Sequence, residues 1–156
     1  MPPRSLRRDC PRDHAHLVEE TRPVLGPDVK VDACPTCHGI YLDKGELLRL
    51  TGNRPLNTFL TKYVGIDSDS TLLCPGCGGI MDLEDAAGVK VDVCITCFGL
   101  WLDAGELEQL QDADPKAFRE LSPEKRAELF DMQYAKQREA ARRKAMRGLF
   151  GGLRRR

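Results

Sequence analysis

Seven cysteines carry the most reactive side chains of the sequence, and six of them stand in three Cys-x-x-Cys pairs. Two of these pairs, Cys74 with Cys77 and Cys94 with Cys97, lie near each other in the chain. This spacing lets both thiolates of a pair reach one ion, and a structural zinc ion takes four such donors in a tetrahedron. Redox use would favour a low-pKa cysteine at a helix start within a βαβ pattern, which the sequence lacks. The pattern therefore predicts a closed four-thiolate zinc site.

A second site would have to use a fourth ligand of another type, because only three cysteines remain for it. These are Cys10, Cys34 and Cys37. Aligning the two halves of the chain puts Asp13 opposite Cys77, with His14 and then His16 further along. Zinc prefers imidazole to carboxylate in closed sites, and one turn can present both Cys10 and His14. We expect His14 to complete this site, with His16, Asp13 or a vacant position as alternatives, and hence two zinc ions per chain.

The two cysteine groups belong to an internal repeat, because residues 29–47 recur with few changes as residues 89–107. Alternating stretches over about 17–31 and 80–93, interrupted by turn residues, predict β-hairpins. Each copy then ends in Asp-x-Gly-Glu-Leu, in which an Asp followed three residues later by Glu is typical of a capped helix start. We expect short helices over about 44–50 and 104–111, with Asp43 and Asp103 as N-caps closed by Glu46 and Glu106.

Aromatic residues are scarce, since the 156 residues include five Phe, three Tyr and one Trp. Tyr41 and Trp101 occupy equivalent positions of the repeat, so we expect each to cover the zinc site of its own copy. His38, which follows Cys37, is expected to pack on its turn. Modules this small need staples in place of a large core. The fold class expected is a small metal-stabilised α+β fold: two tandem zinc ribbons, each with β-hairpin knuckles and a short helix, followed by a basic helical tail.

Composition divides the chain into a first ribbon (1–52), a linker (53–70), a second ribbon (71–113) and a basic helical tail (114–156). The linker has apolar residues at helical spacing. In the tail, Asp114-Pro115 and Ser122-Pro123 each place a capping residue before a proline, which predicts two helix starts. We expect the longer helix to run from about 123 to 147 and to stop at Gly148. Its apolar stripe would contain Ala127, Phe130, Tyr134, Ala141 and Ala145.

The formal net charge of zero hides a strong asymmetry. Residues 1–113 carry a net charge of −7, whereas residues 114–156 carry 13 Lys and Arg against six Asp and Glu, a net charge of +7. A basic tail beside zinc ribbons makes contact with nucleic-acid phosphates the leading hypothesis. The alternatives are a protein-interaction scaffold and peripheral docking on an anionic membrane, since Met146 and the apolar residues up to position 153 interleave with arginines.

Enzymatic function is disfavoured by the residue inventory. A four-cysteine zinc site leaves no open position for water, and the chain contains no phosphate loop, dinucleotide fingerprint or nucleophile elbow. A zinc hydrolase at the first site is the less favoured alternative. The N-terminal residues show no apolar secretory signal and no stretch is long enough to span a membrane. We therefore expect a reduced, cytoplasmic protein with zinc as its cofactor.

The motif Cys-x-Gly-x-Trp-Leu-Asp-x-Gly-Glu-Leu at residues 97–107, together with the Cys-x-x-Cys pairs before it, resembles the bacterial transcription-factor-IIB-type zinc-finger family. The resemblance covers about residues 10–50 and 74–110 and leaves the tail outside. It implies small zinc ribbons and metal binding first, and contact with DNA second. The first copy departs from the family pattern in having Asp13 and His14 where a second cysteine is usual, and Tyr41 in place of Trp.

Overall fold

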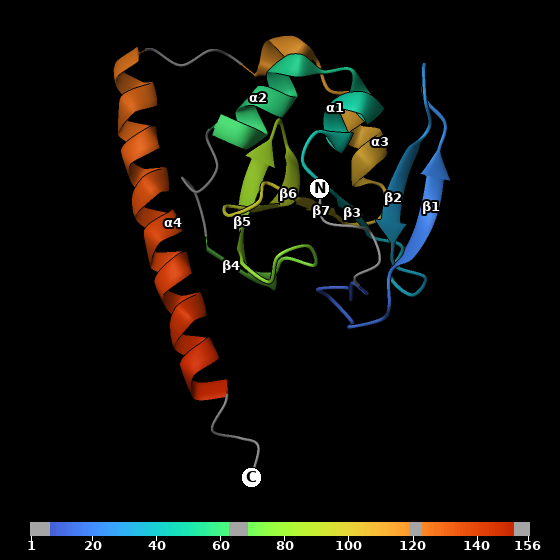
Figure 1. The fold of residues 1–156 in the computed structure, drawn as a ribbon. Coiled ribbons are helices and arrows are strands. Elements are labelled where there is room, and N and C mark those ends of the chain that lie inside the picture. Colours follow the sequence, from blue (N-terminus) through green and yellow to red (C-terminus); the bar gives the residue numbers. More distant parts are fainter. Residues whose placement is uncertain (1–6, 63–68, 119–122, 152–156) are drawn as a thin grey trace.

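Both copies of the repeat contribute strands to one antiparallel sheet in the computed structural model, which describes residues 7–62, 69–118 and 123–151 (Figure 1). The order of the strands is β1-β2-β3-β7-β6-β5-β4. Their bounds are β1 Val18–Arg22, β2 Val29–Ala33, β3 Ile40–Leu42, β4 Asp69–Leu73, β5 Ile80–Ala86, β6 Val89–Cys94 and β7 Leu100–Leu102. The helices are α1 Glu46–Thr51, α2 Arg54–Lys62, α3 Glu106–Gln111, the 3-10 turn η1 Pro115–Ala117 and α4 Pro123–Gly151. This arrangement confirms the predicted fold class of two ribbons followed by a helix.

The two ribbons meet at the centre of the sheet, where the equivalent strands β3 and β7 pair antiparallel. Tyr41 lies opposite Trp101, Ile40 opposite Leu102, and Leu42 opposite Leu100. Equivalent strands that pair in this way relate the two copies by an approximate two-fold axis through the Tyr41–Trp101 pair. The two ribbons therefore form the two halves of one sheet and are not separate domains joined by a linker.

Alternation along the strands divides the interior into two layers. One face of the sheet carries aliphatic side chains that pack under the helices, among them Val31, Leu42, Val91 and Leu102. The opposite face carries Tyr41, Trp101 and Met81, which form a second buried cluster with the cysteines. The short helices α1, α2 and α3 thus support the sheet from one side, and the candidate metal ligands gather on the other.

The short helices α1 and α3 begin later than expected. Gly45 and Gly105 adopt left-handed backbone conformations, and each helix starts at the following Glu. The Glu part of the predicted capping box is present, because the Glu46 and Glu106 carboxylates accept from the backbone N–H of Asp43 (2.9 Å) and Asp103 (2.7 Å). Neither helix start has a side-chain cap, so the expected capping role of the two aspartates was wrong.

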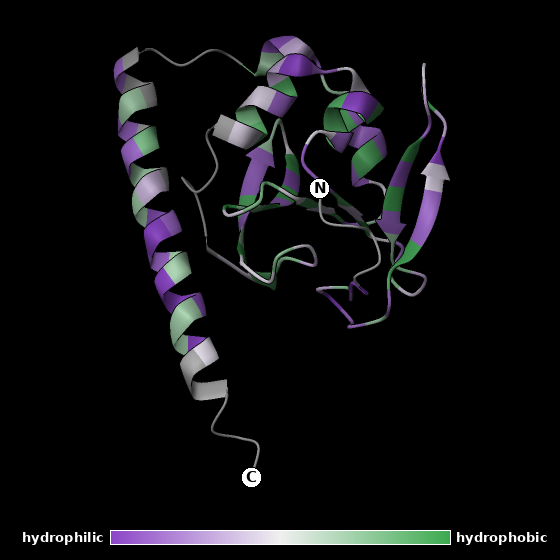
Figure 2. Ribbon diagram, in the orientation of Figure 1, coloured by the Kyte–Doolittle hydropathy of each residue, from purple (hydrophilic) through white to green (hydrophobic). Residues whose placement is uncertain are grey.

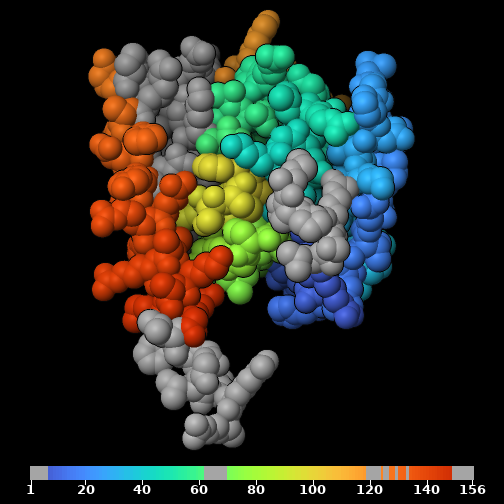
Figure 3. Space-filling model, viewed as in Figure 1, coloured from blue at the N-terminus to red at the C-terminus, as the bar shows by residue number. Residues whose placement is uncertain are grey.

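Two segments between and after the ribbons are more closely packed than their description as linker and tail suggests. The expected linker contains α2, whose start is capped by Asn53, and whose Leu56 and Leu60 are buried in the core. The α4 helix continues through Gly148 to Gly151. Polar and apolar residues alternate along α4 without a continuous apolar side (Figure 2). The helix lies along the second ribbon, while the first ribbon is on the other side of the molecule (Figure 3).

Candidate metal centres

Four turns of the same hydrogen-bonding pattern hold the candidate ligands. In each, the N–H of the leading cysteine donates to the carbonyl five residues on, and the N–H of the residue four positions on donates to the cysteine carbonyl. The leading cysteines are Cys10, Cys34, Cys74 and Cys94. The residue four positions after each adopts a left-handed conformation: His14, His38, Gly78 and Phe98. The second candidate ligand of each turn is the residue three positions after the leading cysteine, just before the left-handed residue.

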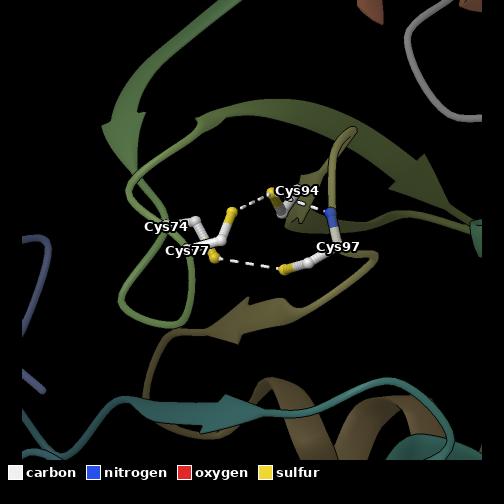
Figure 4. A group of neighbouring side chains, drawn as sticks. All are labelled: Cys74, Cys77, Cys94 and Cys97. Carbon is white, nitrogen blue, oxygen red and sulfur yellow. Dashed lines mark hydrogen bonds between the residues drawn. The ribbon is translucent and has the colours of Figure 1, made fainter. Parts of the chain in front are cut away.

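The second ribbon brings four thiols together from the β4–β5 and β6–β7 turns (Figure 4). The sulfur atoms of Cys74 and Cys97 are 3.6 Å apart, and those of Cys77 and Cys94 are 3.4 Å apart. A tetrahedral ion with Zn–S bonds of about 2.3 Å requires S···S separations of about 3.8 Å. The donor types and their spacing therefore fit a zinc ion without rearrangement of the backbone.

Electrostatics around these sulfurs favour the thiolate form that a metal requires. The N–H groups of Gly76 and Gly79 donate to the sulfurs of Cys74 (3.3 Å) and Cys77 (3.4 Å). The side-chain contact with Cys74 lowers the pKa of Cys77 to about 6, while contact with Cys77 raises the pKa of Cys74. Contact with Cys74 also lowers the pKa of Cys97. Two of the four thiols thus favour the thiolate form, and a bound cation would displace the remaining protons.

The first ribbon brings Cys10, Asp13, Cys34 and Cys37 together. The sulfurs of Cys10 and Cys37 are 3.6 Å apart, and an Asp13 carboxylate oxygen lies 3.4 Å from the Cys34 sulfur. Cys10 and Cys34 are buried, whereas Asp13 is exposed. The N–H of Ala15 donates to the Asp13 carboxylate at 2.9 Å and lowers its pKa, which keeps the carboxylate ionised. This group also fits a small divalent ion, with an exposed oxygen as its fourth donor.

The expected fourth ligand, His14, is not brought to this group. It occupies the left-handed fourth position of its turn and its side chain is exposed. The cause is the register of the turn: Asp13 takes the position that Cys37, Cys77 and Cys97 take in the others. His16 is also exposed and pairs with Asp9. Asp13 is the residue that the alignment of the repeat sets opposite Cys77.

The two central aromatic residues each cover the metal cluster of the other ribbon. The Tyr41 hydroxyl, from the first ribbon, lies 3.4 Å from the Cys74 sulfur and 3.6 Å from the Cys97 sulfur. The Trp101 ring, from the second ribbon, fills the space where a side chain at Gly39 would stand, since a Cβ there would lie 2.2 Å from the ring. The expectation that each aromatic covers its own site was wrong, because pairing of β3 with β7 exchanges them.

Two arginines join carboxylates that are equivalent in the two copies. The pairs are Arg8 with Asp32 (2.6 Å) and Asp43 (3.0 Å), and Arg12 with Asp92 (3.1 Å) and Asp103 (2.8 Å). Arg12 belongs to the first metal turn, so its ion pairs cross to the second ribbon. Burial raises the pKa of Asp92, and Arg12 opposes that effect. Neither arginine was predicted from the sequence, where the only signal is the recurrence of both aspartates in the repeat.

Comparison with known proteins gives one match. The model of a family described as transcription factor zinc-finger matches residues 9–52 and 73–113. No curated protein and no solved structure matches the chain. Each matched segment contains one of the two metal-ligand clusters.

Proposed function

The chain belongs to the transcription factor zinc-finger family, with two tandem copies of its ribbon, and we propose that it is a non-catalytic binding protein. In this proposal two structural zinc ions hold the ribbons together, and α4 presents cations to nucleic-acid phosphates. The two parts of the proposal depend on different residues. They can therefore be tested separately.

The zinc part rests on the donor sets. Cys74, Cys77, Cys94 and Cys97 would hold one ion, and Cys10, Asp13, Cys34 and Cys37 the other. Zinc bound there would cross-link the two turns of each ribbon, so its binding free energy would be largely folding free energy. Four protein donors leave no position for a reacting water, which favours a structural role over a hydrolytic one.

The nucleic-acid part rests on one observation: between residues 136 and 147, α4 carries six cationic side chains and one carboxylate. The cations are Lys136, Arg138, Arg142, Arg143, Lys144 and Arg147. All except the half-buried Lys136 are exposed. Exposed cations in a row neutralise phosphates and release condensed counterions, which yields affinity without sequence preference.

A membrane and a protein are the alternative partners to nucleic acid. No helix among the described residues is long and apolar enough to cross a membrane. An interfacial helix would combine cations and large apolar residues along the same length. On α4 the exposed Phe130, Met132 and Tyr134 precede the cationic stretch, and Met146 alone lies within it. The exposed aromatic residues favour a protein partner as the second candidate function, with α4 docking into a groove.

Metal analysis tests the zinc part directly. Protein purified under reducing conditions should contain two zinc ions per chain, and the Cys94→Ser variant should contain one or none. One ion per chain in the zinc-saturated wild type would contradict the two-site proposal.

Salt-dependent binding to a labelled DNA duplex tests the nucleic-acid part. Affinity should fall linearly on a logarithmic scale with rising salt, with a slope of about −0.9 for each phosphate contacted. A chain lacking residues 136–156 should lose binding and keep its zinc. If the shortened chain binds as tightly as the full chain, α4 is not the contact surface.

A further inference from the structure

The cationic stretch of α4 is held against the turns of the second metal cluster. Lys144 donates from its ammonium group to the carbonyl of Cys77 at 2.9 Å, and the Gln137 amide donates to the carbonyl of Ile95 at 2.7 Å. Ala140, between them, is only 9% exposed. One side of α4 is therefore fixed on the two turns that carry the ligands, and its cations have defined positions relative to them.

A small cleft lies where α4 meets the first of these turns. Its walls are the Gly78-Gly79 backbone with Ile80 on one side, and Ala140, Arg143, Lys144 and Arg147 of α4 on the other. No carboxylate of the described residues lines it. Gly78 is exposed, and a Cβ built on it would meet no atom within 4 Å, so a ligand can approach the backbone there.

Neighbouring depressions on α4 differ in charge from this cleft. The one alongside is lined by Asp82 and Glu139 as well as by cations. The one formed by α4 alone contains Arg138 and Arg142, but also Glu139. Glu139 pairs with Arg143, and this contact joins two groups that are both more than half exposed. Such an exposed pair is weak and can give way to a bridging anion.

We propose that the cleft between the Gly78-Gly79 turn and Arg143, Lys144 and Arg147 is the seat of one backbone phosphate of a bound nucleic acid. This inference rests on the proposed contact of α4 with nucleic acid and assigns its anchoring point. The arginines supply planar donors suited to phosphate oxygens, and Lys144 adds a fixed point charge. Because one wall is a metal turn, the seat exists only when α4 is docked on the folded second ribbon.

Two double variants of equal charge distinguish a defined phosphate site in the cleft from a diffuse basic surface on α4. Arg143→Gln with Arg147→Gln removes cations from the cleft. Arg138→Gln with Arg142→Gln removes the same charge from the side of α4 that faces away from the ribbon. In the zinc-loaded full chain, anisotropy titrations with a labelled short DNA duplex should give at least about a tenfold loss of affinity for the cleft variant. Its salt slope should fall by about 0.9, the value for one phosphate. The outer variant should lose less than about threefold and keep its slope.

A third variant tests the opposite wall without touching α4. The positions equivalent to Gly78 hold His14, His38 and Phe98, so side chains are accepted in this left-handed conformation, and Asn and Asp adopt it readily. Gly78→Asp would put a carboxylate at the mouth of the cleft and should weaken DNA binding by at least about tenfold. Gly78→Asn, its uncharged match, should bind within about threefold of wild type. Zinc content and helicity of each variant verify the fold.

Each outcome decides between the proposals. Equal losses in the two arginine variants, or equal effects of Asp and Asn at residue 78, would overturn the seat while leaving α4 as a diffuse contact surface. A wild-type chain that binds no DNA or RNA at low salt would overturn the proposed function itself. The same holds for a chain that prefers vesicles of anionic phospholipid to nucleic acid.

Discussion

The two ribbons share one fold and one sheet but have unequal candidate metal centres. The second centre has four thiols, is covered by α4 at the carbonyls of Cys77 and Ile95, and receives the Tyr41 hydroxyl from across the seam. The first centre has three thiols and an exposed carboxylate, Asp13. Thiolate is the softer donor and holds zinc more firmly than carboxylate. The difference indicates that a duplicated site can keep its backbone while its ligand and its cover diverge.

The unequal centres are nevertheless coupled by the seam between β3 and β7. Trp101 fills the space at Gly39, which ends the Cys34 turn of the first ribbon. Arg12, in the Cys10 turn of the same ribbon, pairs with Asp92 of the second ribbon. Damage to either centre should therefore reach the other ribbon. The coupling is mutual. Because the second centre is more enclosed, it should contribute more than the first to the free energy of unfolding.

Breaking the second centre should have the largest effect. Cys97→Ser removes a thiolate that the centre depends on and should cost more than about 3 kcal/mol of stability, because metal binding is coupled to folding in modules of this size. Amide resonances of residues 39–42 in the first ribbon should shift as well, since β7 and Trp101 lose their support. Cys37→Ser is the matched change in the first centre and should cost less. Equal losses from the two variants would contradict the ranking of the centres.

The fourth ligand of the first centre is the next largest test. Loss of a group that only supports a metal ligand lowers metal affinity by about 10–100-fold. Asp13→Ala removes a ligand itself and should lower the zinc affinity of the first centre by more than that. Asp13→Cys should strengthen it and make the two centres alike in a chelator titration. His14→Ala, next in sequence, should leave zinc affinity unchanged. A loss of the first ion in His14→Ala with retention in Asp13→Ala would instead restore the histidine as the ligand.

Features that depend on residues close in sequence could be predicted, whereas contacts between distant residues could not. The Cys-x-x-Cys pairs, the repeat and the alternating strands predicted both ribbons, because each depends on residues close in sequence. The pairing of β3 with β7 was not predictable, since three-residue strands carry no signal for their partner. That pairing decides where Tyr41 and Trp101 lie. Because it was not predicted, each aromatic residue was assigned to the metal cluster of its own ribbon instead of the other one.

The helix starts and the tail show the same limit. The Asp-x-Gly-Glu-Leu motif suggested two side-chain caps, but Asp43 and Asp103 instead bind Arg8 and Arg12 from distant positions. On α4 the apolar stripe suggested a packed side, yet Phe130 and Tyr134 are exposed and the helix docks through Gln137, Ala140 and Lys144. Hydrogen bonds to backbone carbonyls leave no periodic trace in the sequence.

Removing the Tyr41 hydroxyl tests whether this residue supports the metal cluster of the other ribbon, and we expect a smaller effect. Tyr41→Phe keeps the ring, which is 1% exposed, but deletes the donor beside Cys74 and Cys97. A net hydrogen bond is worth about 1 kcal/mol, or roughly a fivefold change in affinity. Zinc should be released more readily from the second centre, although the mutation lies in the first ribbon. Release from the first centre instead would show that Tyr41 supports its own ribbon.

The smallest effect concerns pH and the half-buried carboxyl of Glu106 in α3. Burial raises the pKa of Glu106 to about 7 from its ordinary 4.5. A raised pKa in the folded state means that the protonated form stabilises the fold fully below about pH 4.5, and that this contribution is lost as the pH rises through about 7. Glu106→Gln stays neutral and can still accept from the Asp103 N–H, as Gln does in capping boxes. With zinc saturating, this variant should be more stable than wild type at about pH 8 by up to roughly 1 kcal/mol, a figure discounted for partial solvent screening. The advantage should shrink towards about pH 5.5. Glu108→Gln, on the exposed side of the same helix, is the matched control, and an equal pH trend in both variants would contradict the assignment to Glu106.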